Sequence, residues 1–214
     1  MPRPEGLVDA ALALQTAAAR RILIGITGQP GAGKSTVAER LVADLGERGE
    51  TAVLVPMDGF HLPNVALEAL GRRGRKGAPD TFDVAGYVAL LTRLRTPGDA
   101  TAPAFDRAPA FDRATDEPVA DAIVIPAATR IVVTEGNYLL TGSGGWEAVR
   151  PLLDVAWFVD LEDGLRLDRL VARHVAFGKS PEAATAWANG PDAENAALIA
   201  GTRDRADRVI ENNT

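Results

Sequence analysis

The chain has 214 residues, a formal net charge of −6, no cysteine and two histidines. This composition excludes disulfide frameworks, zinc–thiolate sites and thiol nucleophiles, and the acidic balance argues against nucleic-acid binding, which needs a basic surface. The length and the hydrophobic content of 46% suit one globular domain over residues 1–214, and no apolar run approaches the length of a membrane span.

The first predicted element is a helix over about residues 5–19, which is rich in Ala and Leu but carries Asp9 and Gln15. Because no cationic start precedes an apolar core, we interpret it as a helix that packs on the domain and not as a signal peptide. A buried strand over residues 22–27 follows, and then a helix over residues 34–46 with apolar residues at helical spacing.

A glycine-rich loop joins this strand to this helix, and residues 28–35 match the pattern G-x-x-x-x-G-K-[ST]. Backbone N–H groups and the helix dipole make such a loop a phosphate site. Lys34 is expected to reach the β- and γ-phosphates of ATP, and the Ser35 hydroxyl to ligate Mg²⁺. The residues predicted to bind the nucleotide are Gly28, Gly31, Ala32, Gly33, Lys34, Ser35 and Thr36.

Asp58 follows a second apolar strand over residues 51–57, which we expect to lie beside the phosphate-loop strand. A kinase that phosphorylates a hydroxyl needs a carboxylate near the acceptor oxygen, so Asp58 is the candidate base. The alternative is a turn aspartate that bonds its own loop. His61 is open between a substrate contact and a packed loop residue.

A polar segment over residues 59–83 comes next, with a short helix expected over residues 65–70. It carries four cations, at Arg72, Arg73, Arg75 and Lys76. They form either a solvated charged face or a loop over the acceptor site. A helix over residues 84–94 follows, and the proline-rich stretch over residues 96–128 is expected to be irregular or extended.

A tandem hexapeptide lies in that stretch: residues 103–108 recur at once as residues 109–114. Each copy contains the word Phe-Asp-Arg. The repeat is too short for a solenoid unit, so we interpret one copy as an insertion in a surface hairpin. The sequence leaves open which copy faces the site.

Glu135 closes a third buried strand over residues 131–134, where phosphate-loop enzymes place a carboxylate that holds the Mg²⁺ shell. An acid after an apolar strand is also common without that role. After a fourth strand over residues 155–159, an arginine-rich helix over residues 164–177 carries Arg173. It is either a lid that neutralises phosphate charge, over about residues 166–180, or ordinary surface charge.

The remaining elements are one or two helices over residues 181–200 and a short last strand over residues 208–211. Strands that alternate with helices predict an α/β fold with a mostly parallel sheet. We therefore expect the three-layer P-loop NTPase fold, with helices on both faces and a small lid. Ligands in such folds bind at the carboxyl ends of the strands, where Asp58, Glu135 and the glycine loop all fall.

These words together resemble the uridine kinase, pantothenate kinase and phosphoribulokinase group of phosphate-loop kinases, and the whole pattern is similar to bacterial proteins of the nucleoside/nucleotide kinase or fructokinase type. The matching words are residues 28–36, 57–64, 75–83, 134–140 and 169–174, with Phe-Asp-Arg at 105–107 or 111–113.

The resemblance implies a base role for Asp58, an Mg²⁺-linked role for Glu135 and a lid role for Arg173. It also implies acceptor contacts from Tyr138, from Lys76 and His61 in the intervening words, and from one Phe-Asp-Arg copy. That copy supplies either Asp106 and Arg107 or Asp112 and Arg113. Because uridine and pantothenate kinases carry other words there, an arginine points to an anionic or polyhydroxylated acceptor.

The leading hypothesis is a cytoplasmic enzyme that uses ATP and Mg²⁺ to phosphorylate a hydroxyl of a small metabolite: a sugar such as fructose, a nucleoside or a pantothenate-like compound. No nucleic-acid or membrane partner is expected, and a homodimer is a reasonable expectation for a small enzyme. A GTPase needs an Asn-Lys-x-Asp word, which is missing. A non-catalytic or regulatory ATP/GTP-binding protein is the remaining alternative.

Overall fold

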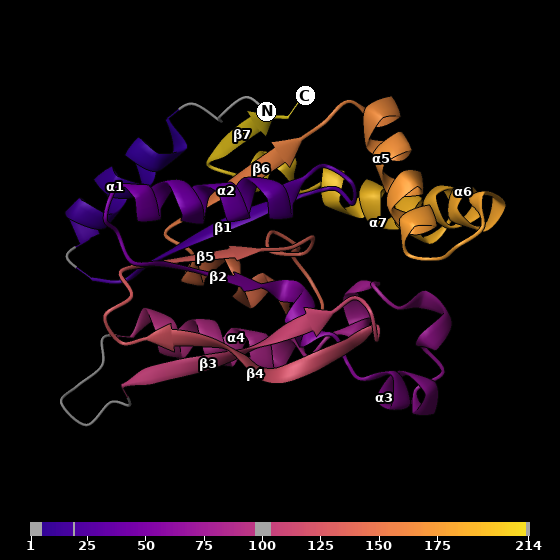
Figure 1. The fold of residues 1–214 in the computed structure, drawn as a ribbon, viewed down its shortest axis with the longest axis horizontal. Helices are drawn as coiled ribbons and strands as arrows, with labels where there is room; N and C mark the ends of the chain where they lie inside the picture. Colours follow the sequence, from indigo (N-terminus) through magenta and orange to yellow (C-terminus); the bar gives the residue numbers. More distant parts are fainter. Residues whose placement is uncertain (1–5, 19, 97–103, 213–214) are drawn as a thin grey trace.

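The fold is built on a five-stranded parallel sheet, in a computed structural model that describes residues 6–18, 20–96 and 104–212. The strands lie in the order β2-β5-β1-β6-β7 (Figure 1). Their bounds are β1 Ile22–Gly28, β2 Ala52–Pro56, β5 Ile131–Glu135, β6 Val155–Asp160 and β7 Arg208–Glu211. This arrangement confirms the predicted α/β class with a parallel sheet.

The central strands are apolar on both faces, which is why they read as continuous hydrophobic runs and lie in the middle of the sheet. Ile24 and its neighbours at alternate positions pack under α1 (Leu7–Ala18) and α2 (Lys34–Glu47), whereas Leu23 packs toward α4 (Val84–Arg95). The two sets of side chains form separate apolar clusters on opposite faces, so the three layers follow from the alternation along each strand.

One expectation about neighbouring strands is wrong: the strand that leads to Asp58 does not lie beside the phosphate-loop strand. β5 lies between them, with Val132 paired to Leu23 on one side and to Val53 on the other. The burial of the strands explains this order, because β5 is buried at every position and β2 is only partly buried, as suits an edge.

Three helices gather at the carboxyl ends of the strands: α5 (Asp163–Ala176), α6 (Pro181–Asn189) and α7 (Pro191–Ala200) (Figure 1). Each boundary has a local cause. The Glu162 side chain caps α5 by accepting from two backbone N–H groups, Gly178 has a φ of 94° in the turn after α5, and Ser180 caps α6 ahead of Pro181. None of the helices in the described segments is long and apolar enough to cross a bilayer.

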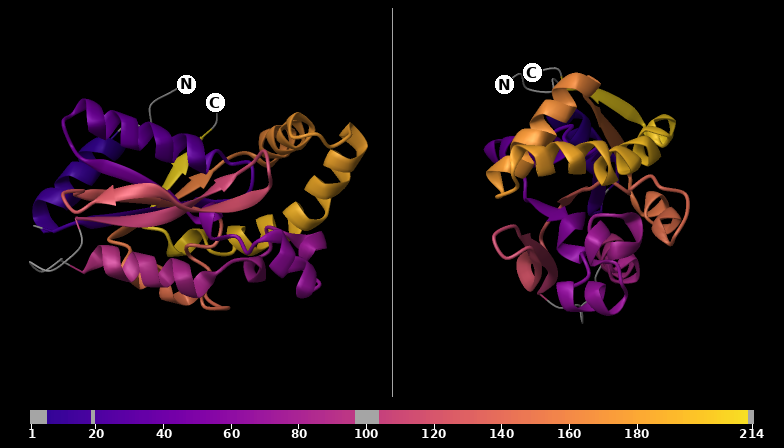
Figure 2. Two further views of the ribbon diagram at one scale, coloured as in Figure 1. Left: turned by 60° about the horizontal axis from the view of Figure 1, so that its bottom comes forward. Right: turned by 90° about the vertical axis from the view of Figure 1, so that its right-hand side faces the viewer.

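The stretch expected to be irregular or extended contains an antiparallel hairpin, β3 (Phe105–Asp112) and β4 (Glu117–Pro126), while residues 97–103 lie outside the described ranges. The hairpin lies along the β2 edge of the sheet, beside α4 (Figure 2), and its buried residues Ala108 and Ile125 belong to the apolar cluster that contains α4. The pairing of the two strands shifts at Pro109. Two residue steps on β3, from Ala108 to Ala110, lie opposite four residue steps on β4, from Ile123 to Val119. This bulge accommodates a proline that has no N–H to donate to the ladder.

The helices α2 and α4 lie where the helical spacing predicts them, and α3 (Asn64–Ala69) and β7 are also present. The expected helix over about residues 5–19 is observed as α1, with residues 5 and 19 outside the described ranges. Residues 181–200 form two helices, because Pro191 begins a second helix directly after the Gly190 cap.

The fully buried Ile24 side chain in the central strand gives a test of this core. We expect Ile24→Ala to lower the free energy of unfolding by about 2–5 kcal/mol, because it leaves a cavity between β1 and the helices above it. Val65→Ala in α3 is the control, since Val65 is 73% exposed and its loss should change the value by less than about 0.5 kcal/mol. Urea unfolding of both variants measures the difference, and equal values would contradict the assignment of β1 to the core.

Candidate active site

The glycine-rich loop is shaped by close backbone approaches that leave no room for side chains. A Cβ at Gly28 would lie 2.3 Å from the Val159 carbonyl oxygen, and one at Gly31 would lie 2.7 Å from that of Arg166. Gly33, with a φ of 91°, precedes the first residue of α2. The loop therefore leads closely into the N-terminus of α2, and a helix N-terminus is a favourable place for an anion.

Lys34 and Glu135 are buried residues of opposite charge beneath this loop, and they are 9% and 4% exposed. Burial lowers the pKa of Lys34, and the neighbouring carboxylate opposes that shift. Burial also raises the pKa of Glu135, and the charge of Asp58 adds to the increase. Lys34 Nζ donates to the Gln29 carbonyl oxygen at 3.0 Å, a bond that a phosphate oxygen could replace.

Ser35 and Glu135 bring two oxygen ligands together at the same point. The Ser35 hydroxyl donates to Glu135 Oε1 at 3.1 Å, from the first turn of α2 to the end of β5. Hydroxyl and carboxylate oxygens are the donors that Mg²⁺ prefers, and Mg²⁺ commonly takes only one or two of them from a protein and the rest from phosphates and water. The donor set therefore fits the predicted magnesium site.

Asp58 lies across from this pair in a single 3₁₀ turn, Met57–Phe60, directly after β2. Its Oδ2 accepts from Arg113 Nη2 at 3.2 Å. The charges of Asp58 and Arg113 both act on Lys34 and Glu135, so all four groups share one site. The second copy of the hexapeptide, and not the first, thus faces the phosphate loop.

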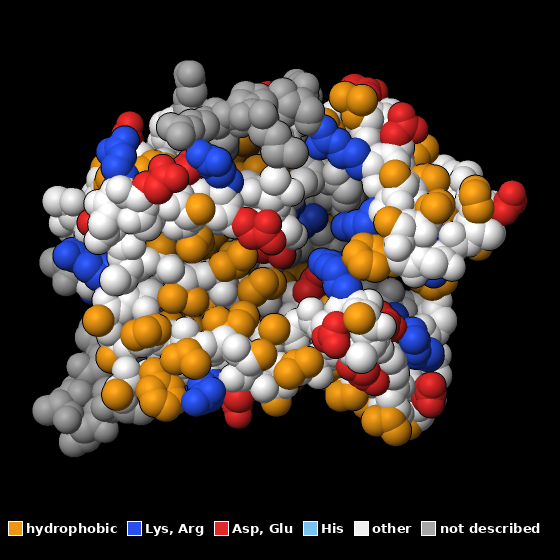
Figure 3. All heavy atoms as spheres, viewed as in Figure 1, with side chains coloured by type: hydrophobic (Ala, Val, Ile, Leu, Met, Phe, Trp, Pro, Cys, Tyr) orange, Lys and Arg blue, Asp and Glu red, His pale blue; other side chains and the backbone are white. Residues whose placement is uncertain are grey.

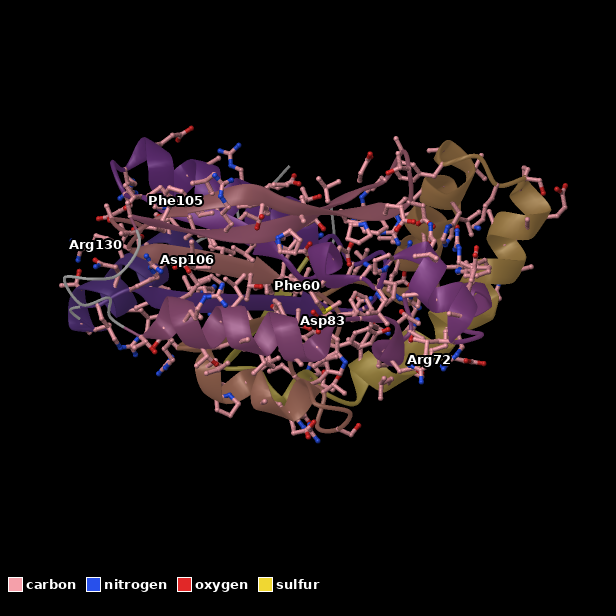
Figure 4. The ribbon with its side chains drawn as sticks, turned by 90° about the horizontal axis from the view of Figure 1, so that it is seen from below. Phe60, Arg72, Asp83, Phe105, Asp106 and Arg130 are labelled. Carbon is pink, nitrogen blue, oxygen red and sulfur yellow. The ribbon has the colours of Figure 1, made fainter. Side chains whose placement is uncertain are left out.

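The first copy lies at the far end of the hairpin, about 20 Å along the strand from the second. Asp106 lies near Arg93 and Arg21, and Arg107 donates to the Asp121 carbonyl oxygen and lies over the Phe105 ring. Figure 4 shows Phe105 and Asp106 well removed from Arg72 in the loop beside the site. Of the four acceptor candidates in the repeat, Asp106 and Arg107 therefore stand away from the phosphate loop.

The hairpin docks on the Asp58 turn because Gly59 has no side chain. A Cβ there would lie 2.2 Å from the Pro109 carbonyl oxygen. His61 extends the same contact, with its ring between those of Phe82 and Phe111 at centroid distances of 4.0 and 4.7 Å. Burial lowers the pKa of His61, and its Nδ1–H donates to the Asp58 carbonyl oxygen at 2.7 Å, so the neutral ring fixes the turn.

Three further residues predicted to contact the acceptor, Lys76, Asp112 and Tyr138, form hydrogen bonds within and between the segments around the site. Lys76 Nζ donates to Asn64 Oδ1 at 2.7 Å and also pairs with Asp116 across the hairpin turn. Asp112 closes that turn by accepting from the Ala114 N–H and the Thr115 hydroxyl. The Tyr138 hydroxyl bonds the Gly77 carbonyl and the Asn195 side chain in α7, and burial raises its pKa.

Arg173 reaches the site from α5, where the charges of Arg113, Asp58 and Glu135 act on it. Desolvation and the positive charge of Arg113 lower the pKa of Arg173, although the residue is exposed at the surface of α5. The next residue, His174, bonds Asp192 at the start of α7 at 2.7 Å and so ties the end of α5 to α7. Figure 3 shows a hollow between the start of α2, α5 and the end of the hairpin, with Lys and Arg side chains on its walls.

Three contacts at the loop were not anticipated from the sequence. Arg166 Nη1 donates to the Pro30 carbonyl at 3.2 Å, Asn212 Nδ2 donates to the Ala32 carbonyl at 2.8 Å, and Gln29 Nε2 donates to the Ala196 carbonyl at 3.4 Å. Only Arg166 had a signal, as a member of the arginine-rich helix. Asn212 lies in a polar chain end that matches no pattern.

Comparison with known proteins assigns this chain to one family. The model of the phosphoribulokinase/uridine kinase family matches residues 23–213. The chain is 31% identical over 194 residues to the uncharacterised protein YggC of Escherichia coli, which covers 90% of this chain and 78% of YggC. It is 33% identical over 156 residues to a uridine kinase of Leuconostoc citreum, which covers 72% and 69% of the two chains.

Solved structures agree with this result. A kinase ascribed to a fructose transport system in Silicibacter sp. TM1040 has a TM-score of 0.79 and 37% identity, covering 93% of this chain and 97% of that one. YFH7 from Saccharomyces cerevisiae has a TM-score of 0.81 over 99% of both chains at 19% identity, a likeness that shows the fold alone.

The contact between Gly59 and Pro109 can be tested by a single methyl group. We expect Gly59→Ala to lower the free energy of unfolding by about 1–3 kcal/mol, because the added Cβ forces the hairpin away from the Asp58 turn. Gly74→Ala, in the neighbouring loop, is the matched control, since no heavy atom lies within 4 Å of its added Cβ. Denaturant unfolding compares the two, and a neutral Gly59→Ala would show that the hairpin is not seated there.

Proposed function

Because this chain belongs to the phosphoribulokinase/uridine kinase family and is a small-molecule kinase, we propose that it transfers the γ-phosphoryl group of ATP to a hydroxyl of a sugar, a nucleoside or a pantothenate-like acceptor. The observation that supports the proposal is the convergence of Lys34 at the start of α2 with Glu135 at the end of β5 and Asp58 directly after β2, where the charge of Asp58 acts on both other groups.

Each group has a role that follows from its place. Lys34 exchanges the Gln29 carbonyl for the β- and γ-phosphate oxygens, and Ser35 and Glu135 would hold Mg²⁺, which neutralises phosphate charge when bound. Asp58 orients the acceptor hydroxyl and accepts its proton. Arg173 supplies positive charge from α5 to the transferring phosphoryl group, whose oxygens carry the charge of the transition state.

The names of the relatives support more than one acceptor class. The Silicibacter kinase is ascribed to fructose transport, which favours a sugar, and the Leuconostoc relative is a uridine kinase, which favours a nucleoside. Both classes of compound carry hydroxyl groups that a kinase can phosphorylate. A non-catalytic nucleotide-binding protein is the second candidate, and it would have no use for a carboxylate at Asp58.

Asp58→Asn separates these two candidates. Removal of the base should lower kcat by about 10²–10⁴ with little change in ATP affinity, because the amide cannot accept the proton. Asp106→Asn is the control, since it makes the same carboxylate-to-amide change at the far end of the hairpin. The measurement is acceptor-dependent release of ADP over a panel of sugars, nucleosides and pantothenate.

Two outcomes would count against the proposal. Turnover by Asp58→Asn at the wild-type rate would remove Asp58 as the base. Tight ATP binding by the wild type with no ADP release for any acceptor in the panel would favour the non-catalytic alternative.

Glu135→Gln tests the magnesium role. The amide is a weaker ligand for Mg²⁺, so we expect the Mg²⁺ concentration at half-maximal rate to rise at least tenfold, while nucleotide binding in EDTA stays near the wild-type value. Glu39→Gln on the exposed face of α2 is the control. A Mg²⁺ titration of Glu135→Gln that matches the wild type would reject this role.

A further inference from the structure

The ion pair between Asp58 and Arg113 occupies an oxygen of the proposed base. Asp58 Oδ2, an oxygen that an acceptor hydroxyl would approach, already accepts a hydrogen bond from Arg113. An acceptor must therefore compete with a guanidinium that is held against the base. Either the acceptor uses the other oxygen of Asp58, or it brings a group that takes Arg113 away.

Arg113 is well placed to accept such a group. Within the described residues its one hydrogen-bond partner is Asp58, through a single contact at 3.2 Å, although a guanidinium has five N–H donors. The side chains of Arg113 and Asp58 are 47% and 30% exposed. An ion pair that is exposed and bound through one contact is weakly held, so a second anion can displace the carboxylate at small cost.

The four cations of the neighbouring loop over residues 72–76 already form structural pairs. Lys76 is held by Asn64 and Asp116, and Arg73 also pairs with Asp116. Arg72 and Arg75 both pair with Asp80. In the described part of this loop each cation thus secures the protein itself, whereas Arg113 is secured only by the proposed base.

We propose that Arg113 is the receptor for an anionic group of the acceptor, and that the acceptor is a small hydroxyl compound bearing a carboxylate or a phosphate. The anion takes the guanidinium in a two-contact arrangement, which planar Arg forms readily with either group, and so frees Asp58 Oδ2 for the hydroxyl. A neutral compound leaves the ion pair between Asp58 and Arg113 intact. The proposal rests on the proposed function and narrows its acceptor class.

The two copies of the hexapeptide provide the matched variants. Both contain Phe-Asp-Arg, but Arg113 contacts Asp58 and Arg107 contacts the Asp121 carbonyl at the other end of the hairpin. Arg113→Gln and Arg107→Gln therefore remove the same charge from the same local sequence. Urea unfolding of each variant checks that the fold is retained, and Arg113→Lys tests whether a single cation suffices.

The first experiment measures anion binding without turnover. Each protein is saturated with Mg²⁺ and a non-hydrolysable ATP analogue, which fills the phosphate loop, and is then titrated calorimetrically with inorganic phosphate and separately with D-glycerate. Arg113→Gln should weaken binding by about 10- to 100-fold, and Arg107→Gln should match the wild type. Asp58→Asn should strengthen binding, because it removes the internal competitor. Equal binding by wild type and Arg113→Gln would overturn the proposal.

The second experiment compares acceptors that share a carbon skeleton and differ in whether they carry an anionic group: glycerate with glycerol, pantothenate with pantothenol, and fructose 6-phosphate with fructose. The charged member of the productive pair should have at least a tenfold higher kcat/KM, and Arg113→Gln should abolish that preference. Preference for a carboxylate or for a phosphate identifies the group. A neutral member that reacts as well as its charged partner would overturn the proposal.

The two experiments distinguish a failure of this proposal from a failure of the proposed function. If anion binding depends on Arg113 but no acceptor releases ADP, the anion site stands and the kinase assignment fails. If a neutral acceptor reacts efficiently through Asp58, the kinase assignment stands and the anion site fails.

Discussion

The burial of two opposite charges under the phosphate loop is the constraint on which the site depends. Lys34 and Glu135 lie almost wholly out of water, and each would be costly to bury alone. They are tolerated because each is near the other and each has a hydrogen-bond partner, Gln29 for the lysine and Ser35 for the carboxylate. This requires β1, β5 and α2 to be fixed with respect to one another, and the two apolar clusters on the faces of the sheet supply that rigidity.

The acceptor side is built differently. It is formed by a 3₁₀ turn, a hairpin and a loop, joined by small contacts such as the approach of Pro109 to Gly59 and the bonds of Lys76. α7 adds a further link, because Asp192 bonds His174 of α5 and Asn195 bonds Tyr138. The proposed nucleotide site thus lies on the sheet and the proposed acceptor site on loops, an arrangement in which loop residues can change without disturbing the sheet.

Much of this structure could be predicted from the sequence because its signals are local. The glycine pattern and the helical spacing after Lys34 placed the phosphate loop, and the strand ends placed Asp58 and Glu135 on one edge. What failed or stayed open depends on contacts between distant segments. The position of β5 between β1 and β2 is set by burial across the whole sheet. The choice between Arg107 and Arg113 depends on where the hairpin docks, and Asn212 reaches Ala32 only through the fold.

The hexapeptide repeat has a length that suits the strand in which it lies. Side chains alternate between the two faces of a strand, so an insertion of six residues, an even number, returns every later side chain to its former face. The bulge opposite Pro109 adds two residues to β4 and keeps the same parity. One whole copy can therefore be gained or lost without turning the later side chains of β3 to the other face, provided that β4 changes by a matching even number of residues and stays paired. The arm that carries Arg113 is in this sense adjustable in length, and related proteins could differ there without rebuilding the rest of the chain.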